Sequence, residues 1–73
     1  MVHKKKGWLA VKTAKENNTC IIFLEGEVSA RKVPELQGEL DEIMAAHPGE
    51  ELVFEARDLT YISSAGLRLL LGV

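Results

Sequence analysis

Cysteine is nearly absent from this chain of 73 residues, which holds a single one, Cys20. A disulfide within the chain is therefore excluded. A zinc site of familiar spacing is excluded as well, because only His3 and His47 could join that cysteine. Cys20 lies in an apolar run, where we expect a buried and inert thiol. A lone reduced cysteine fits a cytoplasmic protein.

Long apolar runs and a strong charge of either sign are also missing. No stretch approaches the roughly 20 apolar residues of a membrane-spanning helix, and the N-terminus lacks the apolar run of a signal peptide. The formal net charge is −2, and one tryptophan, one tyrosine and two phenylalanines are too few for a base-stacking surface. We therefore expect no membrane insertion and no nucleic-acid partner.

Catalytic motifs are lacking too. Neither a GxxxxGKS phosphate loop nor a GxGxxG segment after a strand occurs. Ser64, His47 and Asp58 supply the residue types of a Ser-His-Asp set, but no nucleophile-elbow sequence surrounds the serine. We therefore predict that the protein is not an enzyme and that it binds neither a metal nor a cofactor.

The hydrophobic pattern that is present predicts a hairpin at the start of an α/β fold. Residues 8–14 are typical of a short strand, and the polar KENN segment at 15–18 is typical of a hairpin loop. Residues 19–25 are β-branched and aromatic, and they are apolar on both faces. This second strand is therefore expected to be buried on both sides.

Helical periodicity follows over residues 28–47, with Pro34 in the first turn, where its missing N–H costs nothing. Residues 51–57 predict a third strand, and a strand–helix–strand order with a helix of this length indicates a parallel crossover. After a loop at 58–62, a second helix begins near Ser64. The expected order is β-β-α-β-α, in a mixed sheet with helices packed on it.

Two adjacent serines, Ser63 and Ser64, stand where the polar loop meets the leucine-rich second helix. One of them is expected to cap the helix by accepting a hydrogen bond from a free backbone N–H, while the other stays solvated. Chemical modification of one hydroxyl is a second interpretation. The two interpretations are compatible, because they do not require the same atom.

The segments DLTYISSAGLRLLL at 58–71 and LEGEVSA at 24–30 both resemble motifs of STAS domains, the family of bacterial anti-sigma-factor antagonists. The segment DLTYISSAGLRLLL at 58–71 is similar to the family's Asp-Leu-Ser/Thr turn followed by Asp-Ser-Ser/Thr-Gly-Leu at the start of a helix. The segment LEGEVSA at 24–30 is similar to the family's Leu-x-Gly-Glu-Leu/Val-Asp sequence. The resemblance covers nearly the whole chain and implies a STAS-like fold.

The resemblance also implies a function and a site. It implies a protein-interaction switch that binds an anti-sigma factor, which is a serine kinase, and so controls sigma-factor-dependent transcription in bacteria. Aligning Gly66 and Leu67 with the motif places the regulatory phosphoserine at Ser64, with Ser63 as second choice. Ser63 then replaces the motif's aspartate, and Ser29 replaces another frequent aspartate that resembles a partner contact. The implied partner-binding residues are Glu27, Ser29, Thr60, Ser63, Ser64, Gly66 and Leu67.

Ser63 and Ser29, which replace aspartates of the family motif, leave a second function open. STAS-like modules also serve as adaptor subunits of lipid-transport ATPases and as parts of anion transporters. In such a module Ser63 and Ser64 would act as caps, without phosphoregulation.

The expected domain limits are a flexible N-terminal tail at residues 1–7, which contains HKKK, and a partial STAS domain at 8–73. The sequence ends within the second helix, whereas STAS domains continue with further strands and helices. About a third of the usual domain is therefore expected to be absent, leaving the leucines of 67–71 uncovered and an open strand edge. Either a second copy covers them in a homodimer, or the remainder lies outside this sequence.

Overall fold

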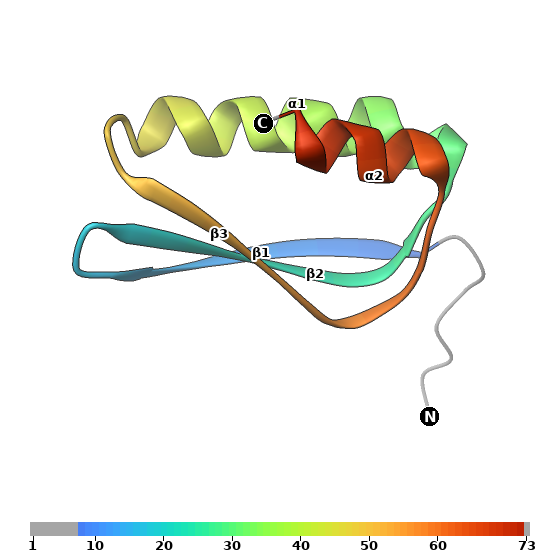
Figure 1. Cartoon of the computed structure of the whole chain (residues 1–73), viewed down its shortest axis with the longest axis horizontal. Coiled ribbons are helices and arrows are strands. Elements are labelled where there is room, and N and C mark those ends of the chain that lie inside the picture. The colour runs from blue at the N-terminus through green and yellow to red at the C-terminus, as the bar shows by residue number, and fades with distance from the viewer. Residues whose placement is uncertain (1–7, 73) are drawn as a thin grey trace.

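A β-hairpin begins the part of the chain that the computed structural model describes, residues 8–72 (Figure 1). β1 (Leu9–Glu16) pairs antiparallel with β2 (Thr19–Val28) along its whole length. Asn17 has a positive φ of 57°, which asparagine tolerates in tight hairpin turns. The loop is shorter than the predicted 15–18, because the strands pair up to the turn. The expected tail at 1–7 lies outside the described residues.

A parallel crossover completes the sheet. The short 3₁₀ helix η1 (Ala30–Lys32) and helix α1 (Val33–Ala46) lead to β3 (Glu51–Ile62), which pairs parallel with β2. Helix α2 (Ser64–Leu71) follows, and the strand order is β1-β2-β3. The predicted β-β-α-β-α order and mixed sheet are confirmed. The first helix begins later than predicted, because β2 and η1 occupy the segment before Val33.

β2 is buried on one face only, which corrects the expectation that it is buried on both. Its residues alternate between buried and half-buried along the whole strand. The fully buried apolar ones are Cys20, Ile22, Leu24 and Val28. Ile21 and Phe23 point to the other face and are half-buried. Both helices cover the same face of the sheet (Figure 1), where Leu36 and Leu40 of α1 complete the core.

β3 is longer than predicted. Residues 58–62, expected as a loop, pair with β2 from Asp58 opposite Glu25 to Ile62 opposite Val28. Two register irregularities interrupt the pairing, and at the second one Thr60 has no partner residue on β2. Bulges leave an extra residue unpaired on one strand while the pairing continues beyond it. They carry β3 to the end of β2, where the two serines begin.

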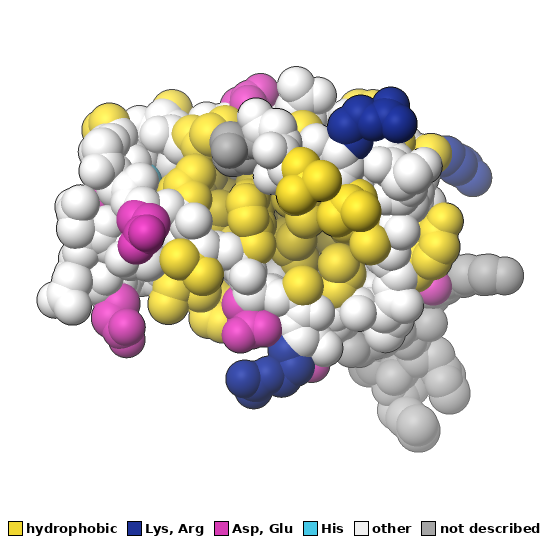
Figure 2. Space-filling model, viewed as in Figure 1, with side chains coloured by type: hydrophobic (Ala, Val, Ile, Leu, Met, Phe, Trp, Pro, Cys, Tyr) yellow, Lys and Arg dark blue, Asp and Glu magenta, His cyan; other side chains and the backbone are white. Residues whose placement is uncertain are grey.

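Several apolar side chains of β3 and α2 are exposed. Within residues 8–72, β3 pairs only with β2, so its outer edge is open as the sequence predicted. Leu67 and Leu71 on α2 are 48% and 78% exposed. Figure 2 shows hydrophobic side chains gathered across the middle of this view of the molecule.

Polar contacts join the hairpin turn to the loop between α1 and β3. The N–H of Glu51 donates to the carbonyl oxygen of Asn18 at 2.9 Å. The carboxylate oxygens of Glu50 lie 3.2 Å from His47 Nδ1, and one of them lies 3.2 Å from Lys15 Nζ. Burial of the Glu50 side chain opposes its ionisation, but its hydrogen bonds to His47 and Lys15, with their charges, outweigh burial and lower the pKa of Glu50.

The lowered pKa of Glu50 predicts a pH dependence of stability. An ionised Glu50 stabilises the fold above its ordinary pKa of 4.5, and this contribution is lost as the pH falls through the lower folded-state value. The free energy of unfolding in urea should therefore fall more steeply between about pH 5 and pH 3 in the wild type than in Glu50→Gln. Glu42→Gln, on the exposed side of α1, should keep the wild-type slope. An unchanged slope in Glu50→Gln would contradict the assignment.

Candidate functional site

The ends of β2 and β3 bring together two serine-containing segments that are far apart in the sequence. Val28 and Ile62 are register partners at these ends, and Ser29 and Ser63 follow them directly. The N–H of Ser63 donates to the carbonyl oxygen of Val28 at 2.7 Å, which ties the two segments together. The carboxyl ends of parallel strands form the edge of an α/β sheet at which ligands commonly bind.

Ser63 is the cap of α2. It has extended backbone angles, φ −73° and ψ 164°, and its Oγ accepts a hydrogen bond from the N–H of Gly66 at 3.1 Å. Its carbonyl oxygen accepts the N–H of Leu67 at 2.9 Å. The side chain is buried, with 9% of the residue exposed. The prediction that one serine of the pair caps the helix is confirmed.

Ser64 is the first residue of α2, and it is exposed. Its hydroxyl makes no hydrogen bond to any other described part of the chain. The adjacent serines therefore differ in kind: the Ser63 hydroxyl is buried and bonded, whereas the Ser64 hydroxyl faces solvent. Of the two serines, only Ser64 presents an exposed side chain at this end of the sheet.

Gly66 allows α2 to lie close to the strand ends. A Cβ atom at this position would lie 2.6 Å from Val28 Cγ1 and 3.1 Å from Ile62 Cγ1, both closer than ordinary van der Waals contact. Gly66 is itself buried. Its small size therefore fixes the distance between the helix start and the two strands.

The other predicted site residues surround this junction. Thr60 is exposed, and its Oγ1 donates to the carbonyl oxygen of Gly26 at 2.9 Å, opposite the bulge. Glu27 is half-buried and pairs in register with Tyr61 of β3. Ser29 is half-buried and precedes η1, where its carbonyl oxygen accepts the N–H of Lys32 at 2.9 Å.

The structure therefore divides the predicted partner-binding residues into those exposed at the surface and those buried beneath it. Ser64, Thr60 and Leu67 are exposed at or near the start of α2, with Glu27 and Ser29 half-buried on the neighbouring segment. The two remaining residues, Ser63 and Gly66, are buried beneath them. These two hold α2 in place and do not present side chains at the surface.

Sequence reasoning missed the cations near this surface. Arg68 is four residues after Ser64 on α2, a spacing that could have identified it, and it is exposed. Arg31 is exposed on η1, which contacts α2, and this proximity depends on the tertiary fold. Lys32 of η1 is already paired with Glu35, at 3.5 Å.

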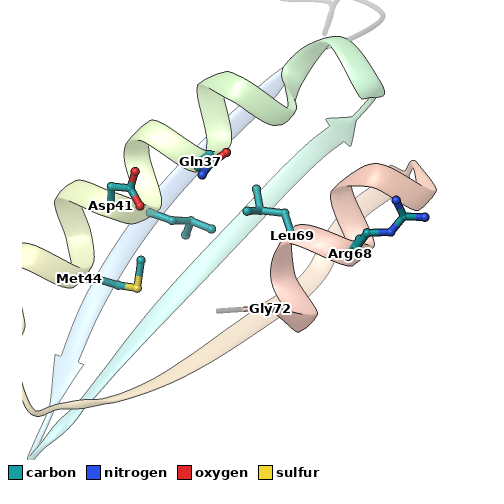
Figure 3. A pocket seen from close by; sticks show the side chains of 7 residues that line it. Gln37, Asp41, Met44, Arg68, Leu69 and Gly72 are labelled. Atoms are coloured by element: carbon teal, nitrogen blue, oxygen red, sulfur yellow. The ribbon is translucent and has the colours of Figure 1, made fainter.

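A cleft of about 290 Å³ lies between α1 and α2, separate from the serines. Figure 3 shows side chains from both helices around it, with Leu69 directed toward α1. Its lining residues are Gln37, Leu40, Asp41, Met44, Arg68, Leu69 and Gly72. Among the described residues, no group of three His, Cys, Asp or Glu side chains could hold a metal ion. No helix within residues 8–72 has the length and apolar character needed to cross a bilayer.

Known proteins share this architecture. The family model of the STAS domain matches residues 10–73. An anti-sigma factor antagonist from Mycobacterium paratuberculosis, solved by crystallography, superimposes with a TM-score of 0.83 at 17% sequence identity. The superposition covers 96% of this chain and 59% of that one, so the chain spans less than two thirds of its structural neighbour. No curated protein sequence matches the chain.

The packing of Gly66 predicts opposite effects for two glycine substitutions. Gly66→Ala places a methyl group against Val28 and should destabilise the fold by about 1–3 kcal/mol. Gly38→Ala, the matched control in α1, meets no atom within 4 Å and should stabilise the fold by up to about 1 kcal/mol through helix propensity. Urea unfolding measures both changes. Equal effects of the two substitutions would show that Gly66 is not a packing position.

The cap at Ser63 predicts a graded series of substitutions. Ser63→Ala removes the acceptor for the Gly66 N–H and should cost about 1 kcal/mol of stability. Ser63→Asp should retain most of the stability, because aspartate is also a good cap. Ser64→Ala is the matched control, and its effect should stay within about 0.5 kcal/mol, because this hydroxyl has no such bond. A larger loss for Ser64→Ala than for Ser63→Ala would reverse the assignment of the cap.

Proposed function

The chain belongs to the STAS domain family, and from that premise we propose that it is an anti-sigma-factor-antagonist-like interaction module whose binding is controlled by phosphorylation of Ser64. Its partner is an anti-sigma factor with serine kinase activity, and the complex acts on sigma-factor-dependent transcription in the bacterial cytoplasm. The module itself catalyses nothing, since the partner holds the ATP. The observation that carries the proposal is the exposed Ser64 hydroxyl beside the buried Ser63 cap.

Accessibility favours Ser64 over Ser63 as the phosphorylated residue. A kinase must bring the γ-phosphate of ATP in line with the hydroxyl oxygen, and the transfer releases ADP and the hydroxyl proton. Ser64 can meet this requirement without unfolding of α2. Ser63 could not, because its Oγ is buried and accepts the Gly66 N–H.

The switch is electrostatic and acts on the complex more than on the fold. Phosphorylation adds close to two negative charges at physiological pH. At Ser64 these charges face the positive end of the α2 dipole, so the modified helix is tolerated or mildly stabilised. A partner surface that closes over the neutral hydroxyl would have to desolvate the dianion instead. A penalty of about 4 kcal/mol would weaken binding roughly a thousandfold.

The residues around Ser64 offer a surface of mixed character to such a partner. Leu67 follows one turn later and is 48% exposed, which provides an apolar contact. Thr60, Glu27 and Ser29 add polar groups from the ends of the two strands. This combination of an apolar residue with surrounding polar groups is typical of protein-binding surfaces.

A second function is supported by the absence of acidic side chains at positions 29 and 63, where the family motif has aspartates. Ser63 keeps the capping role that an aspartate would also fill, so the fold does not require the charge. A kinase that recognises aspartates at these two positions would not find their charges in this chain. The alternative proposal is an adaptor subunit of a lipid-transport ATPase or anion transporter, without phosphoregulation.

Substitution of Ser64 separates binding from folding. Ser64→Asp should keep the free energy of unfolding while weakening the partner complex at least tenfold, and Ser64→Ala should keep both folding and binding. Asn17→Asp, at the hairpin turn, adds an equal charge far from the serines and should bind normally. Titration calorimetry with the cognate anti-sigma factor measures these affinities.

Mass spectrometry after incubation with that kinase and ATP provides the second readout. The wild type should gain one phosphate, and Ser64→Ala should gain none. Normal binding by Ser64→Asp together with no phosphate gain in the wild type would reject the phosphorylation switch and favour the adaptor.

A further inference from the structure

Arg68 is an arginine without an ion-pair partner among the described residues. It lies four residues after Ser64, and both side chains are exposed on α2. Asp41 lies across the cleft between α1 and α2, but the two form no ion pair. Of the two cations on η1, Lys32 is paired with Glu35, whereas Arg31 forms no ion pair with a described residue. Arg68 is therefore available for an anion that arrives on its own helix.

The direction of the Arg68 side chain favours the residue one turn before it. Side chains in an α-helix tilt toward its N-terminus, so a residue at i+4 extends over the residue at i. Figure 3 shows Arg68 directed away from α1, along α2 toward the end at which that helix begins. Ser64 lies at that end. Four residues span about 6 Å along the axis, which is within the combined reach of an arginine and a phosphoserine.

We propose that Arg68 binds the phosphate group carried by modified Ser64, forming an ion pair within α2. The occurrence of this pair in the cell rests on the phosphorylation proposed above. Guanidinium groups bind phosphate oxygens through two parallel N–H···O bonds, which are stronger than bonds between neutral groups. An anion N-terminal to a cation at this spacing is also the orientation that the helix dipole favours.

The pair changes what a partner meets on α2. Before modification, the Arg68 guanidinium is free to bind a carboxylate of the partner. After modification, the phosphate holds it. Phosphorylation therefore adds an anion and removes an available cation at the same surface, and both changes weaken an acidic partner's binding.

The experiment uses the full 73-residue chain with phosphoserine placed at position 64 by chemical synthesis, so that no kinase is needed. Phosphorus NMR follows the second ionisation of the phosphate, whose ordinary pKa is about 6. The phosphate pKa should be about half a unit lower with Arg68 than in Arg68→Gln, a roughly threefold change in the protonation equilibrium. Arg68→Lys should restore part of the difference, because it keeps the charge without the bidentate geometry.

Arg31→Gln and Arg57→Gln are the comparison variants. Arg31 is on η1, which contacts α2, and Arg57 is exposed within β3. Both variants keep Arg68, so their phosphate pKa should equal that of the phosphorylated chain without a substitution. The Nε–H resonance of Arg68 should also move as the phosphate ionises, and it should not move in the unphosphorylated chain over the same pH range.

Two results would overturn the proposal. One is an equal phosphate pKa in the Arg68 and Arg68→Gln chains, each shown to be folded by circular dichroism. The other is a shift caused by Arg31→Gln alone, which would assign the phosphate to η1. Neither result depends on whether a kinase modifies Ser64, so failure here differs from failure of the phosphorylation proposal.

Discussion

The close approach of Gly66 to Val28 and Ile62 is the contact on which the rest of the site depends. Because no side chain separates the helix from the strand ends, the first turn of α2 rests directly on β2 and β3. That position puts the Ser63 hydroxyl under the Gly66 N–H and ties its backbone to Val28. Burial of Ser63 then leaves Ser64 as the hydroxyl that faces solvent. A steric constraint at one glycine thus determines which of two chemically identical neighbours is accessible.

The sequence predicted the order of elements because each has a distinct period and clear punctuation. Hydrophobic spacing and Pro34 located α1, and Asn17 with its polar neighbours located the hairpin. The length of β3 was underestimated, although Thr60, Tyr61 and Ile62 are strand-forming residue types, because the sequence gives no sign of the bulges through which the pairing continues. The one-sided burial of β2 was also missed. An apolar strand shows no sign in its own sequence of whether a second layer exists to cover its other face.

The candidate site, like the fold, was only partly predictable from the sequence. The motif pointed to one stretch of chain, but it could not separate the residues that the structure buries from those that it exposes. Ser63 and Gly66 are buried, Ser64 and Leu67 are exposed, and this division depends on contacts between α2 and distant strands. Thr60 shows a third case, because it is exposed and yet hydrogen-bonded to Gly26 across the bulge. A motif therefore suggests which stretch of chain to examine, and the contacts of the folded chain show which of its residues are exposed and which are buried.

The buried cysteine gives the protein a built-in reporter. Cys20 is fully buried near the start of β2, in the core that Leu36 and Leu40 of α1 complete, and it is the only thiol in the chain. An alkylating reagent in solution can reach its sulfur only when the packing around it opens. The labelling rate of this one atom therefore reports how often the interior opens, and it does so without any engineered probe.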